Sequence, residues 1–250
     1  MNASMSLPQV HVVCPGGYLQ CVTYLIDGPE GAVLVDPGSS TCEAEILQNI
    51  AGLGRNIEEV RFALLTHCHV DHALGAYRFR ELGLKLVSAP YTAQVLRAGN
   101  REVWYEYPGW VVPTEVDVEA GDGATLRLCG LDIRALHTPG HTPGCASYLV
   151  HTQRGLAAFT GDLYGAAGRL TWAGSTGFST AETLKSLERL LAAAPDCVFT
   201  GHGAVQGPAL EWLREGIRMG RAGEWLVDGK FHPDAVPNEK LRTRRPGKNH

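Results

Sequence analysis

The stretch "LLTHCHVDHALGA" at residues 64–76 places three histidines and an aspartate directly after an apolar run. The preceding residues, "VRFALL" at 60–65, are aliphatic and β-branched enough for a buried strand. The following residues, "HALGAYRFREL" at 72–82, have the spacing of a helix. The polar cluster therefore lies where a strand passes into a helix.

The residue types in this cluster suit a metal site. His67 and His69 alternate along an extended segment and point the same way, while Asp71 and His72 follow one turn later. Neutral imidazole and carboxylate are ligands that borderline cations such as Zn²⁺ prefer. In the competing interpretation, Asp71 only caps the helix and the histidines are polar loop residues. The spacing favours two ions side by side.

Three further candidates follow apolar strands later in the chain: His141 in "HTPGHTPG", Asp162 in "FTGD" and His202 in "FTGHG". Each stands beside glycines, where the backbone can turn sharply and bring a side chain to the edge of a sheet. Taken singly, Asp162 is explained as a turn residue and His202 as a loop histidine, and His137 competes with His141. As a set, they complete a ligand group larger than one ion needs.

Composition sets the class of protein. A chain of 250 residues that is 44% hydrophobic can bury one substantial core, and we expect a single α/β domain over 1–228. Residues 229–250 are polar, with several Pro, Lys and Arg, and we expect a C-terminal extension there. The formal net charge of −4 gives no broad cationic surface, so nucleic acid is not an expected partner.

Targeting signals and cysteine usage indicate the compartment. The start of the chain, "MNASMSLPQVHVV", has no basic segment followed by an apolar core, and no later run approaches a membrane span. The seven cysteines are odd in number and scattered without CxxC spacing, as expected for free thiols in a reducing environment. We therefore expect a cytoplasmic protein with no membrane partner.

The order of the elements predicts the architecture. Two successive blocks each run from strands into helices, which favours two sheets back to back with helices outside over one doubly wound sheet. Neither "GxGxxG" nor "GxxxxGK[ST]" occurs, so the sequence gives no support for a nucleotide-binding loop.

The motifs "THCHVDH", "TPGHTPG", "TGD" and "GHG", in this order, resemble those of the metallo-β-lactamase superfamily. The resemblance extends from "VLVDPG" at 33–38 to "GHG" at 201–203 and implies a four-layer αβ/βα sandwich with a dinuclear metal site along one edge. By position it assigns two ligand sets: His67, His69 and His141 for the first ion, Asp71, His72 and His202 for the second, and Asp162 as a bridge between both.

The resemblance also places Asp36, in "VDPG", behind the histidine loop as a supporting residue. An ordinary Asp-Pro-Gly turn is the competing interpretation of this residue. Within the superfamily, an aspartate at position 162 is expected in glyoxalase II-like thioesterases and lactonases. The β-lactamase branches tend to carry Cys or Ser there, which makes β-lactam hydrolysis the lesser alternative.

Two divalent cations per chain, Zn²⁺ before Fe²⁺ or Mn²⁺, would lower the pKa of water and supply a bridging hydroxide at neutral pH. Asp71 and Asp162 are the candidate catalytic residues, since ligand carboxylates can orient the water and move its proton. We therefore expect hydrolysis of an ester, thioester or lactone in a small-molecule substrate.

Two other classes of function stay open on the sequence. An iron oxygenase of the persulfide dioxygenase type would bind one ion through His67, His141 and Asp162. A non-catalytic metal-binding protein would have little reason to keep every ligand.

Substrate selection is expected from aromatic loops. The 100–118 segment, "NREVWYEYPGWVVPTEVDV", fits no clear period, and we expect it to cap the metal edge. Local core packing and a homodimer interface are the competing interpretations. The candidate contacts are Tyr18, Trp104, Tyr105, Tyr107, Trp110, Tyr164 and Trp172.

Overall fold

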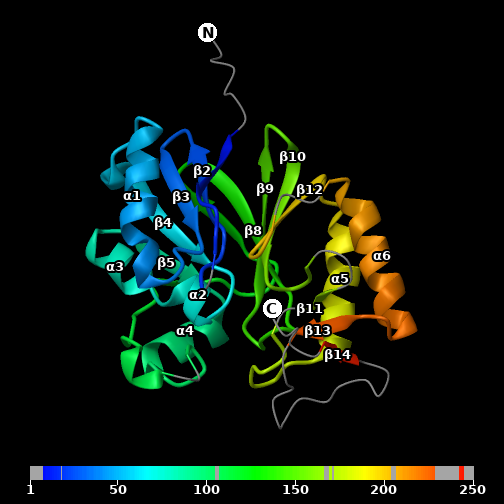
Figure 1. Ribbon diagram of the computed structural model, residues 1–250. Coiled ribbons are helices and arrows are strands. Elements are labelled where there is room, and N and C mark those ends of the chain that lie inside the picture. Colours follow the sequence, from blue (N-terminus) through cyan, green and yellow to red (C-terminus); the bar gives the residue numbers. More distant parts are fainter. Residues whose placement is uncertain are drawn as a thin grey trace, which may run out of the picture.

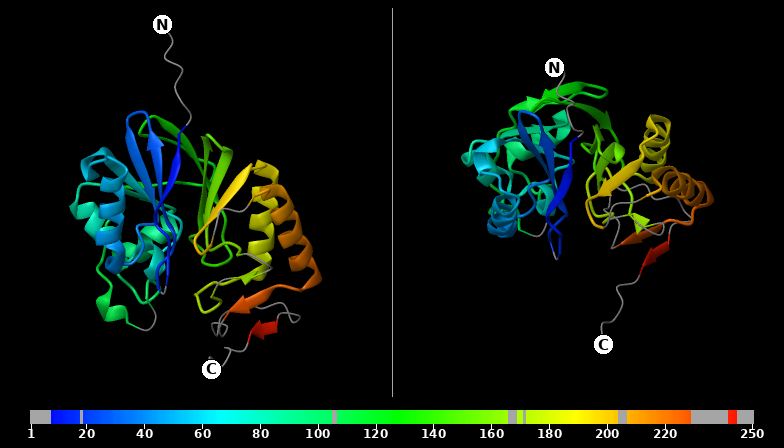
Figure 2. Two further views of the ribbon diagram at one scale, coloured as in Figure 1. Left: turned by 45° about the horizontal axis from the view of Figure 1, so that its top comes forward. Right: turned by 90° about the horizontal axis from the view of Figure 1, so that it is seen from above.

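Two β-sheets face each other, with helices on both outer faces (Figure 1). The computed structural model describes residues 8–17, 19–104, 107–165, 169–170, 172–203, 207–228 and 242–244. Views from other directions show the early helices on the outside of one sheet and the late helices on the outside of the other (Figure 2). This layering confirms the predicted αβ/βα sandwich.

The first sheet has six strands, in the order β1-β2-β3-β4-β5-β6. Its first three strands pair antiparallel, and the pairs from β3 to β6 are parallel. The strands are β1 (Val10–Cys14), β2 (Thr23–Gly28), β3 (Gly31–Val35), β4 (Val60–Leu65), β5 (Lys85–Ser88) and β6 (Val118–Glu119). The helices between them are η1 (Ser40–Cys42), α1 (Glu43–Gly52), η2 (Ile57–Glu59), α2 (Val70–Ala73), α3 (Ala76–Glu81), α4 (Pro90–Ala98) and η3 (Pro108–Trp110).

The second sheet has five strands, in the order β12-β10-β9-β8-β7. The β10–β12 pair is parallel and the others are antiparallel. The strands are β7 (Thr125–Leu128), β8 (Leu131–His137), β9 (Ala146–Thr152), β10 (Gly155–Gly161) and β12 (Cys197–Thr200), and the helices are α5 (Thr180–Ala193) and α6 (Ala209–Ala222). None of the described helices has both the length and the apolar character needed to cross a bilayer.

A small third sheet joins a late loop to the end of the chain. It contains β11 (Arg169–Leu170), β13 (Leu226–Asp228) and β14 (Arg242–Arg244), all parallel. Three residues of the expected C-terminal extension thus pair with β13. The rest of 229–250 lies outside the described residues.

Two buried tyrosines join the sheets near the ends that carry the candidate ligands. The Tyr148 hydroxyl, from β9, donates a hydrogen bond to the carbonyl of Leu65 at 3.0 Å, two residues before His67. The Tyr24 hydroxyl, from β2, donates to the carbonyl of Thr200 at 2.7 Å, two residues before His202. Because buried hydroxyls need partners, these bonds favour one alignment of the two strand ends.

The helix predicted over 72–82 is in fact two helices, α2 and α3, separated at Gly75. The amide of Gly75 donates to the carbonyl of Gly38 at 2.8 Å. A Cβ atom at Gly75 would lie 2.9 Å from that oxygen, so this close approach requires glycine. The break separates α3 from the short α2, which carries Asp71 and His72.

Candidate metal centre

Loops at the ends of four strands bring the seven predicted ligands together. The segment between β4 and α2 carries the first histidines, and His69 is the N-cap residue of α2. Asp71 lies in the first turn of that helix and is therefore not its cap. The other three follow β8, β10 and β12, and are His141, Asp162 and His202.

The first ligand group contains His67, His69 and His141, whose nitrogen atoms all lie within 4.8 Å of one another. The Nε2 atom of His141 is 2.8 Å from the Nδ1 atom of His69. His67 is fully buried, and its Nε2 atom has no hydrogen-bond partner among the described residues. A buried nitrogen without a partner is costly, and a cation bound by this group would satisfy it.

The second ligand group contains Asp71, His72, Asp162 and His202, whose ligand atoms also lie within 4.8 Å of one another. The Nε2 atom of His202 is 2.9 Å from Asp71 Oδ2. The Nε2 atom of His72 is 3.2 Å from Asp162 Oδ1. The imidazole nitrogens and carboxylate oxygens of this group therefore surround one point, as the ligand atoms of a single cation do.

Asp162 connects the two groups. While its Oδ1 atom faces His72, its Oδ2 atom lies 3.6 Å from Nε2 of His141 in the first group. One carboxylate thus reaches toward both sets of imidazoles. Two oxygens placed in this way suit a bridge between adjacent cations.

The pKa shifts differ between the two ligand groups. Burial lowers the pKa of His69 to about 3 and that of His141 to about 4, so both imidazoles stay neutral and can donate a lone pair. Burial raises the pKa of Asp71, but the neighbouring His72 and His202 outweigh it and hold that pKa at about 2. The second group therefore carries ionised carboxylate, while Asp162 raises the pKa of His202 to about 10, so an entering cation has to displace the proton of this imidazole.

Asp36 contacts the imidazole of His72 on the side that faces away from the second ligand group. Its Oδ2 atom lies 2.8 Å from Nδ1 of His72 and accepts a hydrogen bond from the Thr66 hydroxyl at 2.7 Å. Its Oδ1 atom accepts from the Thr66 amide at 2.8 Å. The carboxylate favours the tautomer with hydrogen on Nδ1, which leaves the Nε2 lone pair of His72 facing the second group.

We expect Asp36→Asn to weaken cation binding at the second group by about 10- to 100-fold, the usual cost of losing such a supporting carboxylate. The amide keeps the shape of the side chain. Its NH₂ group, however, faces a hydrogen-bond donor, from which a carboxylate oxygen accepts in the unchanged protein. Titration of metal-depleted protein against a chelator measures the affinity. Asp27→Asn is the matched control, because Asp27 pairs with His11 at 2.9 Å on β1 and β2. If Asp36→Asn and Asp27→Asn bound the cation with equal affinity, Asp36 would have no supporting role at the second group.

Trp172 is the aromatic candidate that lies at the ligands. Its ring centroid is 5.5 Å from that of His69, and the residue is 36% exposed. It therefore offers an accessible apolar surface beside the first group.

The aromatic residues of 100–118 form a cluster of their own. The ring of Trp104 lies 5.1 Å from that of Tyr107 and 6.2 Å from that of Trp110. Tyr107 and Trp110 are exposed. Tyr105 and Tyr18 lie outside the described residues, and the cap over the metal edge stays a prediction.

Tyr164 needs a correction as a substrate contact. It is 2% exposed, and its ring lies 5.0 Å from that of Trp212 on α6. A Cβ atom at Gly216 would lie only 2.7 Å from the Tyr164 ring, which shows how closely the helix approaches. The chain after Asp162 turns this side chain under α6, where it packs α6 onto the second sheet.

His137 lies outside both ligand groups. Its Nε2 atom is 2.8 Å from the carbonyl oxygen of Pro143, and its backbone amide donates to Asp122. The structure therefore brings His141, and not His137, to the first group.

Two polar residues that hold the ligands have no signal in the sequence. Thr66 donates to Asp36, as described above, and the Ser175 hydroxyl donates to the carbonyl of His141. Ser175 is 34 residues from its partner, so no local pattern predicts the contact.

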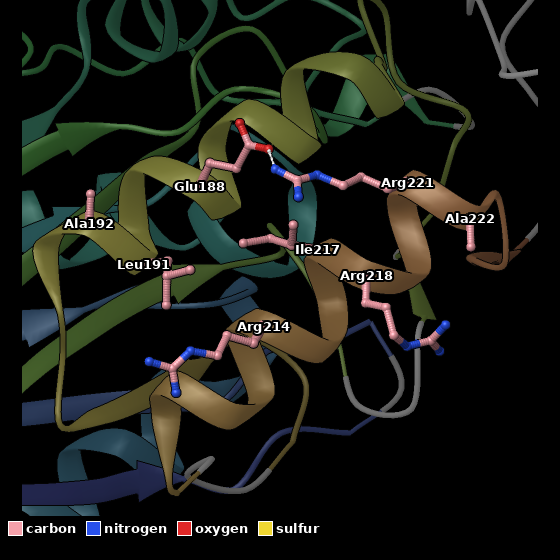
Figure 3. Close-up of a pocket in the computed structure, with 8 residues that line it drawn as sticks. All are labelled: Glu188, Leu191, Ala192, Arg214, Ile217, Arg218, Arg221 and Ala222. Carbon is pink, nitrogen blue, oxygen red and sulfur yellow. Dashed lines mark hydrogen bonds and ion pairs between the residues drawn. The ribbon is translucent and has the colours of Figure 1, made fainter.

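A surface hollow of about 680 Å³ lies between α5 and α6, on the outer helical layer (Figure 3). Its lining includes Leu191, Ile217 and three arginines of α6. Arg221 pairs with Glu188 at 2.7 Å, which offsets part of the positive charge. The ligands lie instead at the strand ends, so this hollow is separate from the metal centre.

A family model described as the metallo-beta-lactamase superfamily matches residues 16–202. The chain belongs to the metallo-β-lactamase superfamily. This match includes all seven ligands and Asp36.

Curated relatives include proteins with different named activities. The chain is 34% identical over 129 residues to a probable metallo-hydrolase of Burkholderia pseudomallei, covering 47% of this chain and 42% of that protein. It is 31% identical over 142 residues to the mitochondrial persulfide dioxygenase ETHE1 of Mus musculus, covering 56% and 46%. It is 28% identical over 172 residues to the hydroxyacylglutathione hydrolase GloC of Haemophilus influenzae, covering 62% and 71%. The chain spans less than half the length of the first two relatives.

Solved structures support the same fold. A metallo-beta-lactamase family protein from Thermus thermophilus superposes with a TM-score of 0.69 at 21% identity, covering 86% of this chain and 80% of that one. At this identity the likeness supports the architecture alone.

Proposed function

We propose that this superfamily member is a dinuclear metal-dependent hydrolase that cleaves an ester, a thioester or a lactone. The observation that carries the proposal is the position of Asp162, with one oxygen 3.2 Å from His72 Nε2 and the other 3.6 Å from His141 Nε2. A carboxylate shared between two complete donor groups suits two adjacent cations. One cation would need only one of these groups.

Divalent cations, Zn²⁺ before Fe²⁺ or Mn²⁺, would supply an activated water nucleophile and polarise the substrate carbonyl when bound. The chain then has to orient that water and move its proton. Asp71 suits this role, because its side chain is 17% exposed, against 6% for Asp162, and can reach incoming substrate. Asp162 is better placed to hold the two groups together.

Similarity to the Haemophilus hydroxyacylglutathione hydrolase supports a thioester as the substrate class. Trp172 adds an apolar wall beside His69 for the acyl or thiol part of a small molecule. We propose no nucleic-acid or membrane partner for this reaction.

Similarity to the mouse persulfide dioxygenase favours a second candidate, an iron oxygenase that uses His67, His141 and Asp162. That reaction would leave the second group without a role, although His202 lies 2.9 Å from Asp71 within it. The complete second group therefore favours hydrolysis.

A substrate panel with oxygen monitoring separates these functions. Metal-loaded protein is offered thioesters, lactones, simple esters, β-lactams and a persulfide, with and without oxygen. We expect hydrolysis of a thioester, ester or lactone at the same rate under both conditions. Oxygen uptake that depends on the persulfide, without hydrolysis of any acyl substrate, would identify the oxygenase instead.

Replacing Trp172 by Ala should raise KM for the best substrate by about tenfold, since an aromatic contact in a site is worth roughly 1–2 kcal/mol. Metal content should not change, because Trp172 offers no ligand atom. Steady-state kinetics with parallel metal analysis measures both. A variant with unchanged KM would remove Trp172 from the substrate site.

If 100–118 caps the site, Trp110→Ala should lower kcat/KM severalfold while metal content and molecular mass stay constant. Trp110 is 72% exposed, so its removal should cost little stability. Light scattering gives the mass in solution beside the kinetics. A change from dimer to monomer with normal kinetics would assign the segment to a homodimer interface and refute the cap.

A further inference from the structure

A second cluster of side chains of the types that ligate metals lies where β1, η1 and α1 meet. Cys14 is the last residue of β1, Cys42 is the last residue of η1, and Glu45 lies in the first turn of α1. Their two sulfur atoms and one carboxylate oxygen all lie within 4.8 Å of one another. None of the three belongs to the ligand groups of the metal centre.

The distances between these atoms are close to the distances between the ligand atoms of a bound cation. Tetrahedral Zn²⁺, with sulfur at about 2.3 Å and oxygen at about 2.0 Å, holds the two ligand atoms about 3.5 Å apart. The Cys14 sulfur lies 3.6 Å from Glu45 Oε2. Two zinc-bound thiolates lie about 3.8 Å apart, which is compatible with the spread of this cluster. Only small side-chain shifts are needed to bind an ion.

The surroundings give the cluster one closed side and one open side. Cys14 is buried, Cys42 is half-buried and Glu45 is exposed. A cation can therefore enter from the Glu45 side, where water can supply a fourth ligand. Burial raises the pKa of the Cys14 thiol to about 12, and Cys42 adds to this effect. Such a thiol is a poor nucleophile until a cation displaces its proton.

We propose that Cys14, Cys42 and Glu45 form a structural site for one thiophilic divalent cation of the Zn²⁺ and Cd²⁺ class. The cation would join the end of β1 to the junction of η1 and α1, which follows later in the sequence. This proposal does not depend on the reaction at the metal centre.

The position of the cluster gives this site a role in positioning the loops beside the metal centre. Between Cys14 and β2, the Cys21 amide donates to the carbonyl of Asp71 at 3.1 Å. Before Cys42, the Gly38 amide donates to the carbonyl of His72 at 3.0 Å. A cation at the cluster would hold Cys14 and Cys42 in place. Because Cys14 precedes one of these two contacts and Cys42 follows the other, the ion would limit the movement of the α2 backbone.

Cadmium titration tests the site, because thiolate-to-cadmium charge transfer in the ultraviolet reports sulfur ligands and not imidazole or carboxylate. The full chain is reduced, depleted of metal and titrated without oxygen, and thiols are then alkylated and mapped by mass spectrometry. We expect a charge-transfer band whose final amplitude corresponds to two thiolate ligands per chain, and cadmium should protect the half-buried Cys42 from alkylation. Glu45→Gln should raise the half-saturating cadmium concentration at least about tenfold.

Cys42→Ser should abolish the band, and Cys14→Ser should abolish the protection of Cys42. Cys197→Ser is the control, since Cys197 is a buried thiol on β12, and it should leave both unchanged. A band that survives in Cys42→Ser but disappears in Cys21→Ser would place the thiolate ligand beside His72 and overturn the proposal. Alkylation of Cys42 at the same rate with and without cadmium would overturn it equally.

Discussion

Asp162→Ala is expected to lose one metal ion per chain and to lower kcat/KM by about three orders of magnitude or more. The side chain supplies both oxygens that face the two ligand groups, at 3.2 Å from His72 and 3.6 Å from His141. Its removal leaves the imidazoles of the second group with Asp71 as their only carboxylate partner in that group. Loss of metal-based activation removes several kcal/mol of transition-state stabilisation.

Metal analysis after gel filtration and kinetics on the best panel substrate measure this prediction. Asp132→Ala is the control, because Asp132 pairs with Arg127 at 2.9 Å on the surface and should leave both values unchanged. An Asp162→Ala protein that keeps two metal ions and turns over near normally would exclude the bridging role.

His141→Ala is expected to empty chiefly the first ligand group, whereas His137→Ala should keep both ions. Both histidines belong to "HTPGHTPG", but only His141 places a nitrogen 2.8 Å from His69 Nδ1. The ring of His137 is held instead by the carbonyl of Pro143. Removing that hydrogen bond should cost about 1 kcal/mol of stability and little metal affinity.

The two variants are compared by metal content, with thermal unfolding to confirm that each is folded. Because His137 ends β8 and His141 lies four residues later in the following loop, each is the control for the other. Loss of metal in His137→Ala with retention in His141→Ala would reverse the assignment. Equal loss in both would mean that the loop conformation, and not a ligand, decides binding.

The architecture and the seven candidate ligands were predictable because their signals are local, whereas the division of the ligands into two sets came from the family resemblance. A buried strand followed by "HCHVDH" fixes the positions of four ligands within six residues. The remaining three stand in short glycine-containing turns after apolar strands, which is a pattern of strand ends. The order of strands and helices then favours two sheets with outer helices.

The features that the sequence did not predict depend on tertiary contacts. Tyr164 follows Asp162 by two residues, and only the approach of α6 at Gly216 decides that the ring faces the core. The break at Gly75 depends on contact with Gly38, in another loop. Cys14 and Cys42 carry no joint spacing signal, because the strands β2 and β3 intervene between them.

The most direct test of the central claim is the hydrolytic rate of metal-depleted protein as Zn²⁺ is added back, without oxygen, on the best acyl substrate. The Cys42→Ser variant is used, so that the proposed thiolate site takes up no metal. If both ligand groups act together through Asp162, full activity is reached only when the second equivalent is bound. Full activity at one equivalent, or activity that requires iron and oxygen, would contradict a dinuclear hydrolase.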